Sequence, residues 1–155
     1  MASPDRNALA TWHNSPACCA FRKIRLRGSN ARRVGMTGLL DTNVALYLLG
    51  GQLAEPLPAG SYGESVITEM ELLAWPSLTT EEEKKVREFL SQLAICELTP
   101  SIRGRAVQLR KEQHLKLPDA IVCATAMEFG VELWTNDLTL AKVPGLNCRT
   151  AKLST

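Results

Sequence analysis

Short apolar segments that fit β-strands alternate with helical segments of about three turns, and this alternation restricts the possible folds more than any other feature. Strands are predicted at residues 38–41, 95–98, 131–135 and 146–149. Helices are predicted at residues 42–49, 65–75, 81–93, 100–113 and 118–129. Strands joined through helices pair in parallel, because the chain must cross back before it starts the next strand. The sequence therefore predicts an α/β fold in which a parallel sheet carries helices on both faces.

Residues 50–63 interrupt this alternation and are predicted to be a loop, because Gly and Pro recur there. Helical spacing also predicts which faces of two helices are buried. The predicted apolar faces comprise Val66, Met70 and Leu73 in the second helix, and Ile102, Ala106 and Leu109 in the fourth.

The positive charge of the 155-residue chain is distributed unevenly. Residues 1–35 contain seven Lys or Arg and one acid, whereas residues 36–155 contain eleven Lys or Arg and fifteen acids. The first segment mixes Pro, Ser, Asn and Gly without a helical or strand period, so we expect a disordered basic extension. We expect residues 36–150 to form one folded domain and residues 151–155 a tail. The mild acidity of that domain argues against simple electrostatic binding of nucleic acid.

Five cysteines at irregular positions argue against a disulfide framework or a zinc site. Cys18 and Cys19 are adjacent, and no Cys-x-x-Cys pair occurs. The sequence also lacks an apolar run of the roughly 18 residues that a membrane-spanning helix needs. We therefore expect a protein of the reducing cytoplasm.

Four acidic residues stand in apolar surroundings. Asp41 and Asp137 follow predicted strands, whereas Glu71 lies in an apolar helix and Asp119 opens another. Ligands of parallel sheets bind beyond the carboxyl ends of the strands, which draws attention to Asp41 and Asp137. Carboxylates that gather repel one another, and a divalent cation that prefers oxygen ligands, such as Mg²⁺ or Mn²⁺, relieves this repulsion. Acids without His or Cys partners therefore indicate hard-metal phosphoryl chemistry.

Each of these acids also has a purely structural interpretation. Asp41 can cap the helix that follows it, and Asp119 can stabilise a helix N-terminus. Glu71 can be an exposed helix residue, and Asp137 can satisfy the backbone of a turn. Taken singly, each residue leaves the alternative open, whereas the four together favour a site.

Four ordered segments carry a resemblance to a known family. They are LLDTNV (39–44), SVITEMELLA (65–74), LPDAIVCATAMEFG (117–130) and LWTNDLTLAKVPGL (133–146). Together they resemble the PIN-domain ribonucleases, and most closely the VapC-type toxins of type II toxin–antitoxin systems. The resemblance covers roughly residues 37–149. It implies a PIN-like three-layer α/β/α fold, with a short parallel sheet flanked by helices.

The resemblance also implies an endoribonuclease that depends on Mg²⁺ or Mn²⁺. Asp41, Glu71 and Asp119 match the three core acids of the family, and Asp137 matches the usual fourth. By the same resemblance, Asp41, Asp119 and Asp137 would ligate the metal. Glu71 would hold a second metal or a water.

Two polar residues match supporting positions of the same family. Asn43 matches a position that orients Asp41, and Thr135 matches a hydroxyl position beside the fourth acid. The segment after Asp137 lacks the acid–Phe pair of many relatives, so a turn-forming role of Asp137 remains an alternative.

Basic side chains on the fourth predicted helix, and just after it, would hold RNA phosphates beside the acids. They are Arg103, Arg105, Arg110, Lys111 and Lys116. A solvated helix face explains them equally well. By resemblance we also expect a homodimer and a small antitoxin protein that lies over the active-site groove. The partner groove would lie between the first helices and the predicted helix at residues 81–93. Tyr47, Leu48 and Trp75 could line it, although a place in the core suits them as well.

Two other functions remain open at this point. A phosphatase of the haloacid-dehalogenase kind also begins with a strand that ends in an acid. Proteins of that class resemble one another in an Asp-x-Asp motif after this strand, however, and here Asn43 occupies the position of the second Asp. The other alternative is a PIN-like domain that only binds RNA or a protein partner. The four acids argue against it, because binding alone does not need them.

Overall fold

The computed structural model describes residues 35–155, so the predicted basic extension lies outside the described residues except for its last position. In the described range, five strands form one sheet in the order β3-β2-β1-β4-β5, and every pairing is parallel. The strands are β1 (Met36–Leu40), β2 (Ser61–Ser65), β3 (Ala94–Cys96), β4 (Glu132–Trp134) and β5 (Cys148–Arg149). The predicted parallel α/β class is therefore confirmed.

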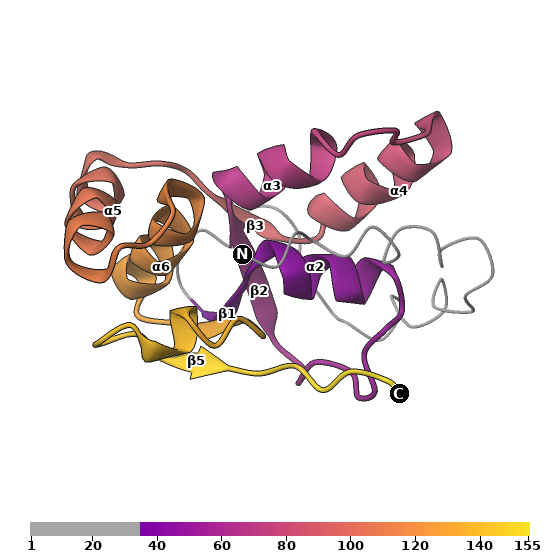
Figure 1. Cartoon of the computed structure of the whole chain (residues 1–155). Helices are drawn as coiled ribbons and strands as arrows, with labels where there is room; N and C mark the ends of the chain where they lie inside the picture. Colours follow the sequence, from indigo (N-terminus) through magenta and orange to yellow (C-terminus); the bar gives the residue numbers. More distant parts are fainter. Residues whose placement is uncertain (1–34) are drawn as a thin grey trace.

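Five α-helices flank this sheet within residues 35–155. They are α2 (Thr42–Leu49), α3 (Val66–Leu73), α4 (Thr80–Leu90), α5 (Pro100–Gln113) and α6 (Leu117–Phe129), followed by the short 3₁₀ helix η3 (Leu140–Lys142). Figure 1 shows α5 and α6 together on one side and α2, α3 and α4 on the other. This is the predicted three-layer arrangement. None of the helices in this range combines the length and apolarity needed to cross a membrane.

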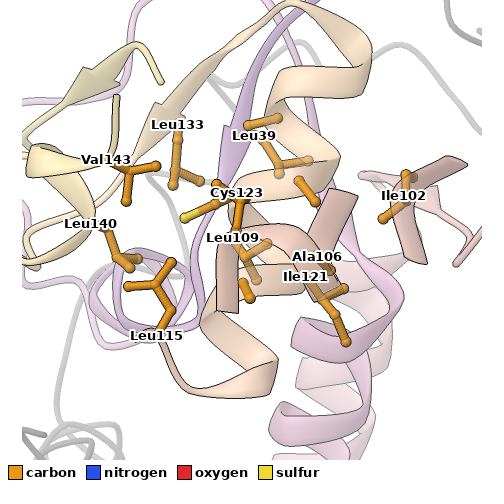
Figure 2. Packing of buried hydrophobic residues seen from close by; sticks show 14 of the residues in the cluster. Leu39, Ile102, Ala106, Leu109, Leu115, Ile121, Cys123, Leu133, Leu140 and Val143 are labelled. Carbon is orange, nitrogen blue, oxygen red and sulfur yellow. The ribbon is translucent and has the colours of Figure 1, made fainter. Parts of the chain in front are cut away.

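Alternation along the central strands divides the core into two clusters, because successive side chains of a strand point to opposite faces. Leu39 of β1 and Leu133 of β4 are buried in the cluster under α5 and α6, which Figure 2 shows from close by. The next residues, Leu40 and Trp134, belong to the cluster formed with α2, α3 and α4. The predicted apolar face of α5 joins the first cluster through Ile102, Ala106 and Leu109.

Strand β2 contradicts the prediction of a loop over residues 50–63. Its sequence, Ser-Tyr-Gly-Glu-Ser, lacks the apolar run that marks a buried strand. Pairing with β1 and β3 decides its conformation instead. Gly63 permits this pairing, because a Cβ atom there would lie 2.9 Å from the carbonyl oxygen of Ala94 in β3. This close approach depends on tertiary structure and leaves only a weak signal in the sequence.

The predicted apolar face of α3 is partly wrong. Met70 is 59% exposed, and the helix buries Thr68 and Leu72 instead. Helix α3 begins at Val66 directly after β2, with Ser65 as its N-cap. No loop separates β2 from α3, so the direction of the strand determines which face of the helix is buried. The spacing of the large apolar side chains does not determine it.

Glu64 of β2 is a buried acid without a neutralising partner. Its side chain is fully buried, and neither carboxylate oxygen has a hydrogen-bond partner. The strand register places it opposite Leu40 of β1 and Ile95 of β3, so it faces the cluster under α2, α3 and α4. Burial and, to a smaller extent, the negative charge of Glu69 together raise the pKa of Glu64 to about 8. The folded protein therefore holds a proton on Glu64 at neutral pH.

The ordinary pKa of Glu64 is 4.5, and its pKa in the folded protein is about 8. We expect the free energy of unfolding to fall as pH rises between these two values. In that window the unfolded chain has released a proton that the folded chain keeps, at roughly 1.4 kcal/mol per pH unit. Between pH 6 and 8, above the pKa of Asp41, urea denaturation of Glu64→Gln should lack this slope, whereas the exposed-helix control Glu88→Gln should retain it. Equal slopes in Glu64→Gln and the wild-type protein would show that Glu64 does not titrate in this way.

Candidate active site

The carboxyl ends of β1 and β4 lie side by side, and the site begins there. The two strands pair in parallel, and the Asp41 N–H continues the ladder by donating to the carbonyl oxygen of Trp134 at 3.1 Å. After β1 the chain builds β2 and β3 toward one edge of the sheet, and it then returns to add β4 and β5 on the other side. Ligands of α/β sheets bind at such a reversal of strand order. Asp41 and the loop after β4 both stand at this position.

A cavity of about 350 Å³ is present there and brings the four predicted acids together. Asp41, Glu71, Asp119 and Asp137 all line it, as does Asn43. They come from the ends of β1 and β4, from α3 and from the first turn of α6. The remaining predicted site residue, Thr135, is buried directly behind Asp41.

Asp41 is fixed through both of its carboxylate oxygens. Oδ1 accepts the N–H of Val44 at 2.8 Å, which caps α2, and Oδ2 accepts the hydroxyl of Thr135. Only 5% of Asp41 is exposed, and this burial raises its pKa to about 6. The two hydrogen bonds act in the opposite direction, whereas the charges of Asp137 and Asp119 add to the increase. Asp41 therefore caps α2 and lines the cavity at the same time.

The turn after β4 carries Asp137 into the cavity. The Thr135 hydroxyl accepts the N–H of Asp137 at 3.1 Å, so Thr135 connects two of the acids. Asp137 Oδ1 accepts the N–H of Thr139 at 2.7 Å, the backbone contact expected of a turn-forming Asp. Asp137 thus shapes the turn and lines the cavity at the same time.

Asn136 connects this turn to the C-terminal segment, a role that the local sequence does not indicate. Its side-chain nitrogen donates to the carbonyl oxygen of Ala151 at 3.0 Å, and its oxygen accepts the Ala151 N–H at 2.9 Å. Ala151 is itself buried in the cluster under α2, α3 and α4. Residues 151–155, expected as a tail, also pair with the loop after α2 through a bridge between Leu153 and Leu53.

Glu71 belongs to the last turn of α3 and is exposed on the cavity wall. The Thr42 hydroxyl donates to its Oε2 atom and lies 3.4 Å from the hydroxyl of Thr68. Thr42 therefore orients Glu71 from the start of α2. Nothing in the local sequence indicates this contact, because local spacing does not show that α2 and α3 meet.

Asp119 lies in the first turn of α6, directly after Pro118, and is half-buried. Burial raises its pKa, and the negative charges of Asp137 and Glu71 raise it further. The positive charge of Lys116 acts in the opposite direction. Asp119 thus has carboxylate neighbours on two sides of the cavity and a basic residue beside it.

The donor chemistry of the cavity fits a hard divalent cation. All four acids offer oxygen ligands, which Mg²⁺ and Mn²⁺ prefer. Neighbouring carboxylates raise the pKa values of both Asp41 and Asp119, and a cation would relieve this excess of negative charge. Within residues 35–155, no three His, Cys, Asp or Glu side chains are already grouped closely enough to hold a metal ion. The acids therefore share one cavity without forming a closed ligand set.

The five predicted RNA-contacting residues divide into two groups. Arg110 and Lys111 line a shallow pocket at the end of α5, where Arg110 Nη1 donates to the carbonyl oxygen of Leu115 at 2.8 Å. The linker from α5 to α6 continues from this pocket to Lys116, which acts on Asp119. Arg105 instead lines a pocket at the opposite end of α6, and Arg103 lies in the first half of α5. The structure therefore does not bring all five together.

Comparisons with known proteins agree on one fold. The PIN-domain family matches residues 38–146. A chain of a toxin–antitoxin complex from Klebsiella pneumoniae is 34% identical, with 71% of this chain and 95% of that chain covered and a TM-score of 0.61. VapBC2 from Rickettsia felis bound to a promoter DNA fragment gives 20% identity, coverage of 76% and 100%, and a TM-score of 0.63. DNA-bound VapBC from Salmonella typhimurium is 21% identical, with 74% of this chain and 98% of that chain covered and a TM-score of 0.63. No curated protein sequence matches the chain.

We expect Thr135→Val to lower the free energy of unfolding by about 1–3 kcal/mol, because it leaves an oxygen of the buried Asp41 carboxylate without its donor. The matched control is Thr125→Val. The Thr125 hydroxyl is equally buried, but it donates at 2.7 Å to the carbonyl oxygen of Ile121 in its own helix. Urea denaturation without added metal should show the larger loss for Thr135→Val. The same loss in both variants would contradict a special role for the bond to Asp41.

Proposed function

The chain belongs to the PIN-domain family, and from this premise we propose that it is an endoribonuclease that uses Mg²⁺ or Mn²⁺, and the toxin of a toxin–antitoxin pair. The observation that carries the proposal is the cavity that Asp41, Glu71, Asp119 and Asp137 line together. A cavity with this charge repels the phosphates of RNA unless a divalent cation neutralises it. Cleavage of a phosphodiester with a divalent cation is the chemistry that best suits such a site.

Three of the acids would hold the cation: Asp41, Asp119 and Asp137. Glu71 would hold a second cation or a water molecule. When bound, the cation supplies an activated water as nucleophile and positive charge that stabilises the charge developing at the phosphate.

The chain's own contribution is to orient these carboxylates before substrate arrives. Asp41 is fixed by Val44 and Thr135, and Glu71 by Thr42. Two hydrogen bonds between Asn136 and Ala151 fix the turn that carries Asp137. Each of these contacts limits the rotation of an acid, and preorganised groups stabilise developing charge better than groups that must reorient.

The partners are part of the same proposal. We expect a homodimer and a small antitoxin protein. The 34%-identical chain from Klebsiella pneumoniae comes from a toxin–antitoxin complex, which supports an antitoxin partner here. The family favours the nuclease over the phosphatase alternative, and an assay with a phosphatase substrate separates the two.

Cleavage of RNA by the purified protein with Mg²⁺ or Mn²⁺, abolished by a chelator, tests the proposal directly. We expect the double variant Asp41→Asn with Asp119→Asn to lose at least ~100-fold in cleavage rate, because it removes two charges from the cation site. A folded double variant that keeps full metal-dependent cleavage would refute the proposed roles. Cleavage by neither variant nor wild type would favour the purely binding alternative.

Helix α3 offers a matched pair of acids. Glu71 lines the cavity, whereas Glu69, two residues earlier, does not. We expect Glu71→Gln to reduce cleavage strongly and Glu69→Gln to leave it close to wild type. Since both changes remove one charge from the same helix, a nonspecific charge effect predicts equal losses. Equal losses would therefore argue against a site role for Glu71.

The five basic residues proposed to contact RNA should differ in strength. Lys111 lies at the end of α5 that leads to Asp119, and Arg105 lies at the far end of α6. We expect Lys111→Ala to weaken binding of a short single-stranded RNA and to lower the slope of log affinity against log salt by roughly 0.7. Arg105→Ala should affect only longer RNA. A larger effect of Arg105→Ala on the short RNA would place the strand elsewhere.

A further inference from the structure

The cavity that holds the four acids also has an apolar wall that phosphodiester chemistry does not require. Its apolar lining consists of Ala74, Trp75 and Pro76 after α3, Pro118 and Val122 of α6, and Leu140 of η3. Helices α3 and α6 pack against each other, so these side chains face one space. A hydrated cation would use the acidic part alone. The apolar wall therefore suits an apolar part of a larger ligand, which a hydrated cation lacks.

Trp75 is the large flat side chain of this wall, and the local backbone fixes its position. It follows Ala74, the C-cap of α3, and lines the same cavity as Glu71. Pro76 restricts the backbone of Trp75 to extended conformations, so α3 cannot continue through it. Ser77 then takes a left-handed conformation with φ 66° and turns the chain toward α4.

The Trp75 ring is anchored without being enclosed. It packs against the cluster under α2, α3 and α4, and it remains half-buried where it lines the cavity. Core packing therefore explains one part of the side chain and leaves another part facing the acids. A ring held in this way loses little freedom when a flat partner stacks on it.

Few ligand classes need both walls of such a cavity. A divalent cation at carboxylates attracts a phosphate, and an indole ring attracts a flat aromatic group. One nucleotide of a single-stranded nucleic acid carries a phosphate and a base within a few bonds of each other. Unpaired bases stack on Trp without requiring a particular sequence.

We propose that Trp75 stacks on an unpaired nucleobase of the RNA whose neighbouring phosphate lies at Asp41, Glu71, Asp119 and Asp137. The proposal rests on the nuclease function and assigns Trp75 a contact with a base next to the cleaved phosphodiester. A base in a continuous duplex is stacked on its neighbours, so its faces are closed to the indole. Trp75 is in this role a positioning residue for substrate.

Two substitutions separate stacking from core packing. Trp75→Phe keeps an aromatic face, whereas Trp75→Leu keeps apolar volume without one. With single-stranded RNA oligonucleotides and Mg²⁺, we expect Trp75→Leu to raise KM roughly 10-fold while kcat changes little, and Trp75→Phe to stay near wild type. Thermal unfolding of both variants checks that they are folded. Equal KM values for the Leu variant and wild type would overturn the proposal while leaving the nuclease function intact.

Fluorescence gives a readout that does not depend on cleavage. The chain has three Trp residues, Trp12, Trp75 and Trp134. With Ca²⁺ in place of Mg²⁺ to neutralise the acids and slow turnover, single-stranded RNA should quench the emission of wild type and not that of Trp75→Phe. Duplex RNA should quench neither protein. A wild-type signal that RNA leaves unchanged would overturn the stacking proposal and assign the apolar wall to another partner, such as a protein.

Abasic RNA completes the test. If one nucleotide without a base is moved along the oligonucleotide, one position should weaken wild-type binding about as much as Trp75→Leu does. The same abasic position should have no further effect in Trp75→Leu, because the two changes remove one contact. Additive effects at every position would refute the contact. If the wild-type protein binds RNA in this way and fails to cleave it, the nuclease function fails and the stacking contact stands.

Discussion

A carboxylate buried between two parallel strands is the constraint on which the rest of the structure depends. Asp41 is removed from water at the end of β1, and an isolated buried charge is costly. The N–H of Val44 and the hydroxyl of Thr135 compensate for part of that cost. The second bond crosses from β1 to the residue after β4, so it exists only when these two strands are neighbours. Site geometry and central sheet pairing are thus stabilised by one contact.

The direct junctions between strands and helices let the sheet determine how helices α2 and α3 are positioned. Helix α2 begins at Thr42, directly after Asp41, and α3 begins at Val66, directly after β2. With no loop at either junction, the register of β1 with β2 sets how the two helices meet. Thr42 consequently reaches Glu71, and the carboxylate on α3 is oriented from α2. The same direct junction explains why Met70 points to solvent although its spacing suggests a buried face.

The cavity combines two kinds of surface that neither nuclease chemistry nor core packing explains alone. Burial and neighbouring carboxylates raise the pKa values of Asp41 and Asp119, which favours a cation, whereas the apolar wall contains a half-buried indole ring. Lys116 acts on Asp119, Lys111 lies at the end of α5 that leads to Lys116, and Arg105 lines a pocket at the far end of α6. A single-stranded polyanion with exposed bases is complementary to all three features.

The sequence by itself determined the α/β class, the bounds of α2 and α5, and the four acids as candidates, because periodicity and apolar context are local properties of the chain. Tertiary structure alone decided that β2 is a strand, since its pairing with β1 and β3 replaces the apolar pattern that it lacks. It also decided that Thr42 and Asn136 help to orient acids, and that Thr135, matched by resemblance to a position beside the fourth acid, also binds Asp41. Their partners lie at positions 71, 151 and 41, and hydrogen bonds between residues so distant in sequence leave no trace in local spacing.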